Sequence, residues 1–197
     1  MQNFKLNRAT AHLAVLQRTE LCGPLLKKFR KLLGRYLFSN FLSKYFINPS
    51  EISNNYQNLM EKEFNLIQKY LKQNDKILSI GSGIGGLEIL INKKLNSNIS
   101  FIEKDYVSRK VKYGWDTKNK EAYNSLKLLN NFLLNNGIKE EQFNLFDFDK
   151  DNLPDTSFDV ADHSTPCPPD LTLRTLPAFS ALIFGIPLPI EKLAYPL

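Results

Sequence analysis

The most regular hydrophobic pattern of the chain surrounds a cluster of glycines near its middle. Residues 76–80 (KILSI) form a short apolar run, residues 81–86 (GSGIGG) hold four glycines, and apolar residues return with helical spacing over residues 87–95. This order predicts a strand, a sharp turn and a helix. A second apolar run at residues 98–102 (NISFI) predicts a strand that ends at Glu103, so the stretch forms one β-α-β unit.

A helix is predicted directly before this unit. Pro49 interrupts the preceding helical pattern, and Ser50 or Ser53 is available as an N-cap of the next helix. The apolar residues of this helix, which recur with helical spacing, are Met60, Phe64, Ile67 and Leu71. We expect this apolar face to lie against the sheet.

Another helix and two more strands are predicted after Glu103. Helical spacing joins Ala122, Leu126, Leu129 and Leu133, and residues 135–137 (NNG) are typical of a C-cap. Residues 142–146 (QFNLF) predict a third strand, an acidic turn follows, and residues 158–160 begin a fourth strand.

The tail beyond the fourth strand has a different composition. Residues 161–197 contain seven of the ten prolines, a single lysine (Lys192) and no asparagine. Since proline cannot donate to a strand ladder, we expect either an irregular cover over the sheet or a sheet that is cut short.

The pattern as a whole predicts an α/β, Rossmann-like fold. We expect a mainly parallel sheet with helices on both faces, preceded by N-terminal helices. The predicted parts are a helical segment (1–48), an α/β domain (49–160) and a proline-rich tail (161–197).

Charge is concentrated at the start of the chain. Residues 1–48 hold nine Lys or Arg and only Glu20, a net charge of +8, whereas the whole chain carries +6. Apolar residues with helical spacing alternate with these cations and are Leu25, Phe29, Leu32 and Leu33. The pattern predicts a basic amphipathic helix, whose partner is an anionic membrane surface, a nucleic-acid backbone or the rest of this protein. The same spacing assigns the rings of Phe29, Tyr36, Phe38 and Tyr45 to the core.

Composition is that of an ordinary globular protein. Of the 197 residues, 43% are hydrophobic and 23% are charged, which suits one main domain. Cys22 and Cys167 lie far apart, so neither a disulfide framework nor a zinc site is indicated. Because no apolar run is long enough to span a membrane, we expect a cytoplasmic protein, with peripheral membrane contact through residues 1–48 as one alternative.

The glycine turn and Glu103 carry the main chemical signal. A carboxylate at the tip of a second strand accepts hydrogen bonds from ribose hydroxyls when a nucleotide lies over such a turn. Gly81, Gly83 and Gly86 have the spacing of a dinucleotide site, whereas Gly81, Gly83 and Gly85 have the tighter GxGxG spacing, so two cofactor classes fit.

Residues 75–160 resemble the cofactor half of a class I S-adenosylmethionine-dependent methyltransferase. The resemblance rests on IGSGIGG after a strand, the acid at the end of the next strand, an aspartate after the third strand, and residues 153–160 (LPDTSFDV) before the fourth. It implies a seven-stranded sheet that is incomplete here. A narrower likeness, to sugar O-methyltransferases of bacterial surface-polysaccharide clusters, rests on residues 121–138 after KVKYGW and on YQNLM in the preceding helix.

The resemblance implies roles for individual residues. Gly81, Gly83 and Gly85 would line the methionine and ribose end of S-adenosylmethionine, and Glu103 would hold the ribose hydroxyls. Asp147 or Asp149 would bind the adenine amino group, with Asp147 favoured because it ends the strand.

One position departs from the family pattern. Ser79 stands where the family carries an acid that helps to hold the methionine ammonium, and serine offers a weaker, uncharged hydrogen bond. Glu88 either compensates for this change or only favours the helix N-terminus through the helix dipole. No metal is expected, because the acidic turn lacks the glycine and closing glutamate of a calcium loop.

Candidates for a catalytic base lie at the end of the fourth strand. Asp162 and His163 occur there, and the ordinary pKa of histidine suits proton abstraction near neutrality, although a structural role is the alternative. The expected function is methyl transfer to a small-molecule hydroxyl such as that of a sugar. The alternatives are a non-catalytic or truncated methyltransferase-like binding protein and, more weakly, an RNA methyltransferase.

Overall fold

The computed structural model describes residues 3–37, 41–107, 123–152 and 158–163. The predictions for the proline-rich tail beyond His163 therefore lie outside the described residues. The helices are α1 (Arg8–Gln17), α2 (Pro24–Leu37), α3 (Ser43–Tyr45), α4 (Pro49–Ile67), α5 (Gly86–Leu95) and α6 (Leu126–Asn135), with 3-10 turns at Thr19–Leu21, Gln68–Tyr70 and Glu140–Gln142. The strands are β1 (Lys76–Ile80), β2 (Asn98–Glu103), β3 (Tyr106–Val107), β4 (Tyr123–Asn124), β5 (Phe143–Asp147) and β6 (Val160–His163).

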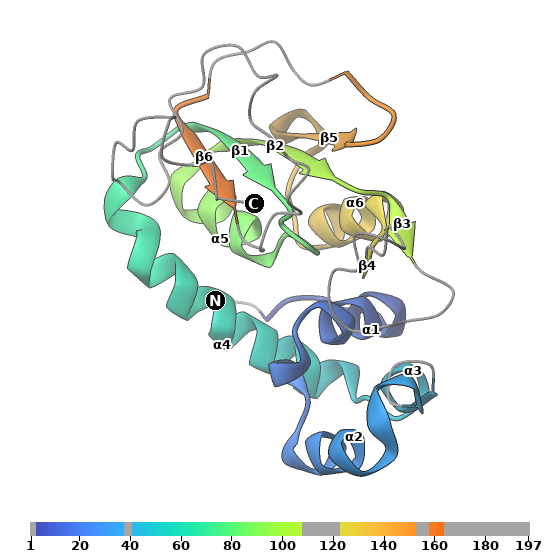
Figure 1. The fold of residues 1–197 in the computed structure, drawn as a ribbon. Helices are drawn as coiled ribbons and strands as arrows, with labels where there is room; N and C mark the ends of the chain where they lie inside the picture. The colour runs from blue at the N-terminus through green and yellow to red at the C-terminus, as the bar shows by residue number, and fades with distance from the viewer. Residues whose placement is uncertain (1–2, 38–40, 108–122, 153–157, 164–197) are drawn as a thin grey trace, which may run out of the picture.

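A four-stranded parallel sheet forms the centre of the molecule (Figure 1). Its order is β5-β2-β1-β6, so the third, second, first and fourth predicted strands lie side by side. Both neighbours of β1 are parallel to it, with Ile77 opposite Ile99 on β2 and opposite Val160 on β6. This order with helical crossovers confirms the predicted Rossmann-like α/β fold.

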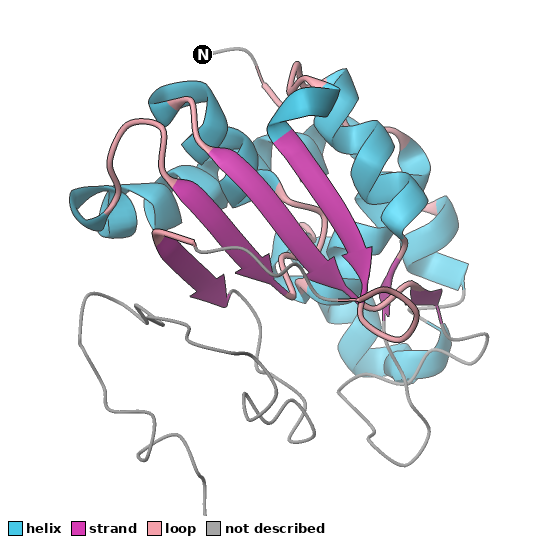
Figure 2. Cartoon of the chain, turned by 90° about the horizontal axis from the view of Figure 1, so that it is seen from above, coloured by secondary structure: helices cyan, strands magenta, loops and turns pink. Residues whose placement is uncertain are grey.

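The two faces of the sheet bury different sets of side chains. Ile77, Ile99 and Phe101 share one core with helices α1, α4, α5 and α6. Figure 2 shows these helices gathered on one side of the strands. On the other face Leu78, Ile80 and Ile102 form a smaller cluster, partly covered by phenylalanines 146, 148 and 158. A helical layer on this second face, which the sequence also predicts, is not found among the described residues.

The start of α4 corrects the predicted cap. Asn48, and neither Ser50 nor Ser53, is the N-cap, and its side chain accepts a hydrogen bond from the Ser50 N–H at 3.0 Å. Pro49 occupies the first helical position, where a missing N–H costs nothing. Ser53 instead donates its hydroxyl to the carbonyl of Phe4, which ties the chain start to α4. The apolar face of α4, including Met60 and Phe64, packs mainly against α5.

Replacing this cap gives a first testable prediction. Asn48→Ala removes an acceptor for the free N–H groups of the first turn of α4, so we expect a loss of about 1 kcal/mol in the free energy of unfolding. Urea denaturation followed by far-UV circular dichroism measures this loss. Ser50→Ala, at an exposed neighbouring position, is the matched control. Equal stability of the two variants would contradict the assignment of Asn48 as the cap.

Helix α6 begins later than predicted and ends as predicted. Tyr123 and Asn124 form β4, which pairs with β3 in an antiparallel ribbon, and Ser125 then caps α6. The helix therefore starts at Leu126 and not at Ala122. At its other end the N–H groups of Gly137 and Ile138 donate to the carbonyls of Leu134 and Leu133. This pair of hydrogen bonds is a Schellman motif, which confirms the predicted C-cap.

The first 48 residues divide into a buried part and an outer part. Ala11, Ala14 and Val15 of α1 belong to the same core as the sheet. Helix α2 lies at the end of the molecule farthest from the sheet (Figure 1). The assignment of Phe29 and Tyr45 to the core was wrong, because both side chains are exposed. The side chains of Tyr36 and Phe38, assigned to the core with them, lie outside what the structure describes. Within the described part of the chain, no helix is both long and apolar enough to cross a membrane.

Candidate cofactor site

The glycine turn lies at the carboxyl edge of the sheet, between β1 and α5. Its backbone has φ of 69° at Gly81, 69° at Gly83 and 76° at Gly85, which is the region that glycine adopts freely. Because the strands are parallel, the ends of β2, β5 and β6 lie at the same edge. Ligands of open α/β sheets bind at this edge, so the sequence prediction of the site's position agrees with the topology.

Glu103, at the end of β2, lies on the glycine turn. Its Oε1 accepts hydrogen bonds from the Gly83 N–H and from the Ser82 hydroxyl, each at 2.8 Å. Only 6% of the residue is exposed. Burial raises its pKa to about 7, although hydrogen bonds from Asn124, Ser82 and Gly83 act in the opposite direction. The turn therefore holds a carboxyl group that titrates near neutral pH.

Asn124 and Ser82 complete this network and were not predicted from the sequence. The Asn124 side chain donates to the Gly83 carbonyl at 2.7 Å. Asn124 reaches the turn because β4 pairs with β3, directly after β2. Nothing in the local pattern indicated that ribbon. Ser82 stands inside the glycine motif, and its polar side chain next to an expected carboxylate was the available signal.

Ser79 and Glu88 lie against each other in the interior. The Ser79 hydroxyl donates to Glu88 Oε1 at 2.5 Å, and both residues are buried. Ser79 sits on β1 and Glu88 in the first turn of α5. A carboxylate is therefore present beside position 79, although it comes from the helix and not from the strand. Glu88 is therefore the hydrogen-bond partner of Ser79 as well as an acidic residue in the first turn of α5.

Two N-terminal helices cover the turn. The Tyr56 hydroxyl, from α4, accepts a hydrogen bond from the Gly86 N–H at 3.0 Å. Burial, together with the charge of Glu88, raises the pKa of Tyr56, so its hydroxyl stays protonated. Gln17, at the end of α1, stands with its Oε1 only 2.6 Å from the place that a Cβ on Gly83 would occupy. The N-terminus of α5 is thus enclosed by α1 and α4.

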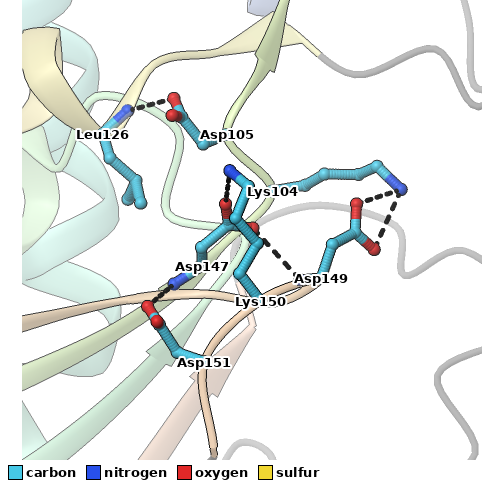
Figure 3. Close-up of polar contacts among 7 residues, drawn as sticks. All are labelled: Lys104, Asp105, Leu126, Asp147, Asp149, Lys150 and Asp151. Atoms are coloured by element: carbon cyan, nitrogen blue, oxygen red, sulfur yellow. Dashed lines mark hydrogen bonds and ion pairs between the residues drawn. The ribbon is translucent and has the colours of Figure 1, made fainter.

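The two candidate aspartates after the third strand have different surroundings (Figure 3). Asp147 ends β5 opposite Glu103, and its carboxylate accepts from the Asp149 N–H and from the Lys150 ammonium. Burial acts to raise the pKa of Asp147, but these hydrogen bonds outweigh it and lower the pKa. Asp149 is exposed and forms an ion pair with Lys104 at 2.9 Å. Asp147 is therefore the aspartate that lies at the sheet edge beside Glu103.

The candidate catalytic residues lie on β6. In the strand register Asp162 is opposite Ser79 and His163 is opposite Ile80, so the backbone of both reaches the carboxyl edge next to the glycine turn. Their side chains lie outside what the structure describes. Among the described residues, no group of three His, Cys, Asp or Glu side chains is placed to hold a metal ion.

Comparisons with known proteins give distant structural neighbours. No protein-family model matches the sequence, and no curated protein matches it. The chain is similar to a protein from Galdieria sulphuraria assigned as a sarcosine dimethylglycine methyltransferase, with 16% identity and a TM-score of 0.34 over 59% of this chain and 37% of that chain. It is also similar to a mutant of MtNAS, with 13% identity and a TM-score of 0.36 over 81% of this chain and 47% of that chain. The matched regions therefore span less than half of either neighbour.

The class of fold follows from the chain's own topology. Four parallel strands in the order third, second, first, fourth, with a glycine turn after the first and a carboxylate at the end of the second, make a Rossmann-like α/β fold.

Proposed function

We propose that this protein binds S-adenosylmethionine at the glycine turn and transfers its methyl group to a small-molecule hydroxyl, with a sugar as the favoured acceptor. The observation that carries the proposal is the position of Glu103. Its buried carboxylate lies 2.8 Å from the Gly83 N–H, at the edge of the sheet where a ribose would stand. A carboxylate is an acceptor for both hydroxyls of a ribose.

The residues present fit the cofactor as a set. Glu103 would accept hydrogen bonds from the ribose hydroxyls. These hydroxyls would replace the Ser82 hydroxyl as its hydrogen-bond donors. Glu88, buried beside Ser79, would supply a negative charge near the ammonium group. Asp147 is the proposed partner of the adenine amino group, because it is buried at the sheet edge and Asp149 is exposed.

The chain's own contribution to the reaction is alignment and proton removal. S-adenosylmethionine, when bound, supplies an electrophilic methyl group for an in-line displacement. The protein has to place the acceptor oxygen behind that methyl and take up the hydroxyl proton. His163 is the proposed base and Asp162 its neighbour, because β6 brings their backbone next to β1.

Isothermal titration with S-adenosylmethionine tests the proposal. Glu103→Gln keeps an acceptor for the Gly83 N–H but removes the charge, and we expect affinity to fall by about tenfold or more. Asp75→Asn is the matched control, since Asp75 is also buried but lies at the opposite end of β1, where it accepts from the Lys72 N–H. Absence of binding by the unmodified protein, or equal losses in both variants, would contradict the proposal.

A non-catalytic binding protein is the second candidate. It is favoured by the cover over the glycine turn, because the Gly86 N–H already has the Tyr56 hydroxyl as its partner. Transfer of a radiolabelled methyl group to any acceptor, lost on Glu103→Gln and kept on Asp75→Asn, would rule this candidate out.

A further inference from the structure

An apolar stripe on α2 is exposed at the end of the molecule farthest from the sheet. Leu25, Phe29 and Leu32 are 66%, 41% and 79% exposed. Their spacing places them on one face of a helix. A monomeric protein seldom leaves several large apolar side chains side by side in water without a partner for them.

Lysines border this stripe on the side away from the protein. At about 100° per residue, Lys28 is next to the stripe and Lys31 and Lys27 follow further around the helix. All three lysines are exposed. Leu26, on the opposite border, packs against the core and fixes which way the helix faces. On the same wheel the stripe lies about a quarter turn from Leu26, between the anchored side of α2 and its lysines, and it stays exposed there.

A second exposed apolar cluster lies beside α2. Phe41, Tyr45 and Phe46, in and beside α3, are exposed. The ring centroid of Phe41 lies 5.4 Å from that of Tyr45 and 5.5 Å from that of Phe46. Lys44 lies 5.6 Å from the Tyr45 ring. Figure 1 shows α2 and α3 together at the end of the molecule away from the sheet. Both elements combine exposed apolar side chains with lysine.

We infer that α2 docks on an anionic lipid surface, with its leucine stripe in the interface and its lysines at the headgroups. A helix that carries Leu and Phe on one face and Lys on the other lies in the plane of a membrane interface in this way. The exposed leucines favour a lipid surface over a nucleic-acid backbone as the partner of α2. Binding to a nucleic-acid backbone needs the cations alone and leaves the leucines in water, whereas lipid uses both. The inference is independent of the proposed methyl transfer.

Vesicle co-sedimentation of the full chain tests the inference. We expect binding to phosphatidylcholine vesicles that contain phosphatidylglycerol, weaker binding to phosphatidylcholine alone, and a decrease with added salt. The double variant Leu25→Asn/Leu32→Asn should lower partitioning by about tenfold or more, because both side chains lose apolar area that the lipid would cover. Lys28→Glu/Lys31→Glu should lower binding to the anionic vesicles only.

The matched control is Leu66→Asn, on α4. Leu66 is 71% exposed, like the leucines of the stripe, but lies at the other end of α4 from α2. It should leave vesicle binding unchanged, and circular dichroism melts should show that all variants fold. Unchanged binding of the leucine double variant, or no binding by the unmodified chain, would overturn the inference. Binding of single-stranded RNA that depends on the lysines and not on the leucines would also overturn it. A dimer that forms without lipid and dissociates in the leucine double variant would do the same.

Discussion

Glu103→Gln is expected to abolish a pH dependence of stability. As pH rises from about 4.5 to about 7, the free energy of unfolding of the unmodified, ligand-free protein should fall by about 3 kcal/mol more than that of the variant. Burial raises the folded-state pKa of Glu103 from 4.5 to about 7. The folded protein therefore binds this proton more tightly than the unfolded chain does. Its contribution to stability is complete below the unfolded pKa and is lost as pH rises through the folded pKa.

The measurement is a pair of urea denaturation series, one for each protein, across this pH range. Other titrating groups affect both proteins alike, so the difference between the two curves isolates Glu103. The same substitution weakens cofactor binding under the proposed function, so stability and affinity should change in opposite directions above pH 7. Parallel pH profiles would show that the Glu103 carboxyl ionises as easily in the folded protein as in the unfolded chain.

Gly85→Ala is expected to destabilise the protein by about 3 to 5 kcal/mol, a large part of the stability of a typical domain. Two costs add at this position. With φ of 76° an added Cβ is strained against the backbone, and it would also lie 2.9 Å from a Leu129 methyl carbon and 3.3 Å from the Phe101 ring. Leu129 and Phe101 are fully buried, so neither can move aside cheaply.

Gly137→Ala is the matched control for this prediction. Gly137 also has a positive φ, of 87°, but a Cβ there would meet nothing within 4 Å. This variant pays only the backbone strain, about 1 to 2 kcal/mol. The difference between the two losses, measured by urea denaturation, gives the packing cost at Gly85. Equal losses would show that the core around Leu129 relaxes to admit a methyl group.

This contrast changes the interpretation of the glycine motif. The spacing Gly81, Gly83 and Gly85 suggested three positions where backbone approaches a ligand. A Cβ on Gly85 would point at Leu129, Leu133 and Phe101. That glycine is therefore required by the contact between the turn and α6, whatever binds on the other side. Gly83 is the glycine whose N–H and carbonyl bind Glu103 and Asn124.

Several site features could not be predicted because they depend on contacts between distant segments. Tyr56 reaches Gly86 from α4, and Gln17 reaches Gly83 from α1. No helix was predicted around Gln17, and no contact with the glycine turn was predicted for Tyr56. The local pattern also placed Tyr123 and Asn124 near a helix start, because it contains no signal for a two-residue ribbon that pairs across an intervening segment.

The sequence by itself determined the β-α-β unit, the parallel strand set and the position of Glu103 at the edge of the sheet. These features depend on periodicity, glycines and strand ends, which act over a few neighbouring residues. Only the tertiary structure decided that α1 and α4 enclose the turn, that Glu88 lies beside Ser79, and that the leucine stripe of α2 stays exposed. The physical reason is that an apolar helix face is the same in sequence whether it meets a core, a lipid surface or water. Which of these it meets depends on how the whole chain packs.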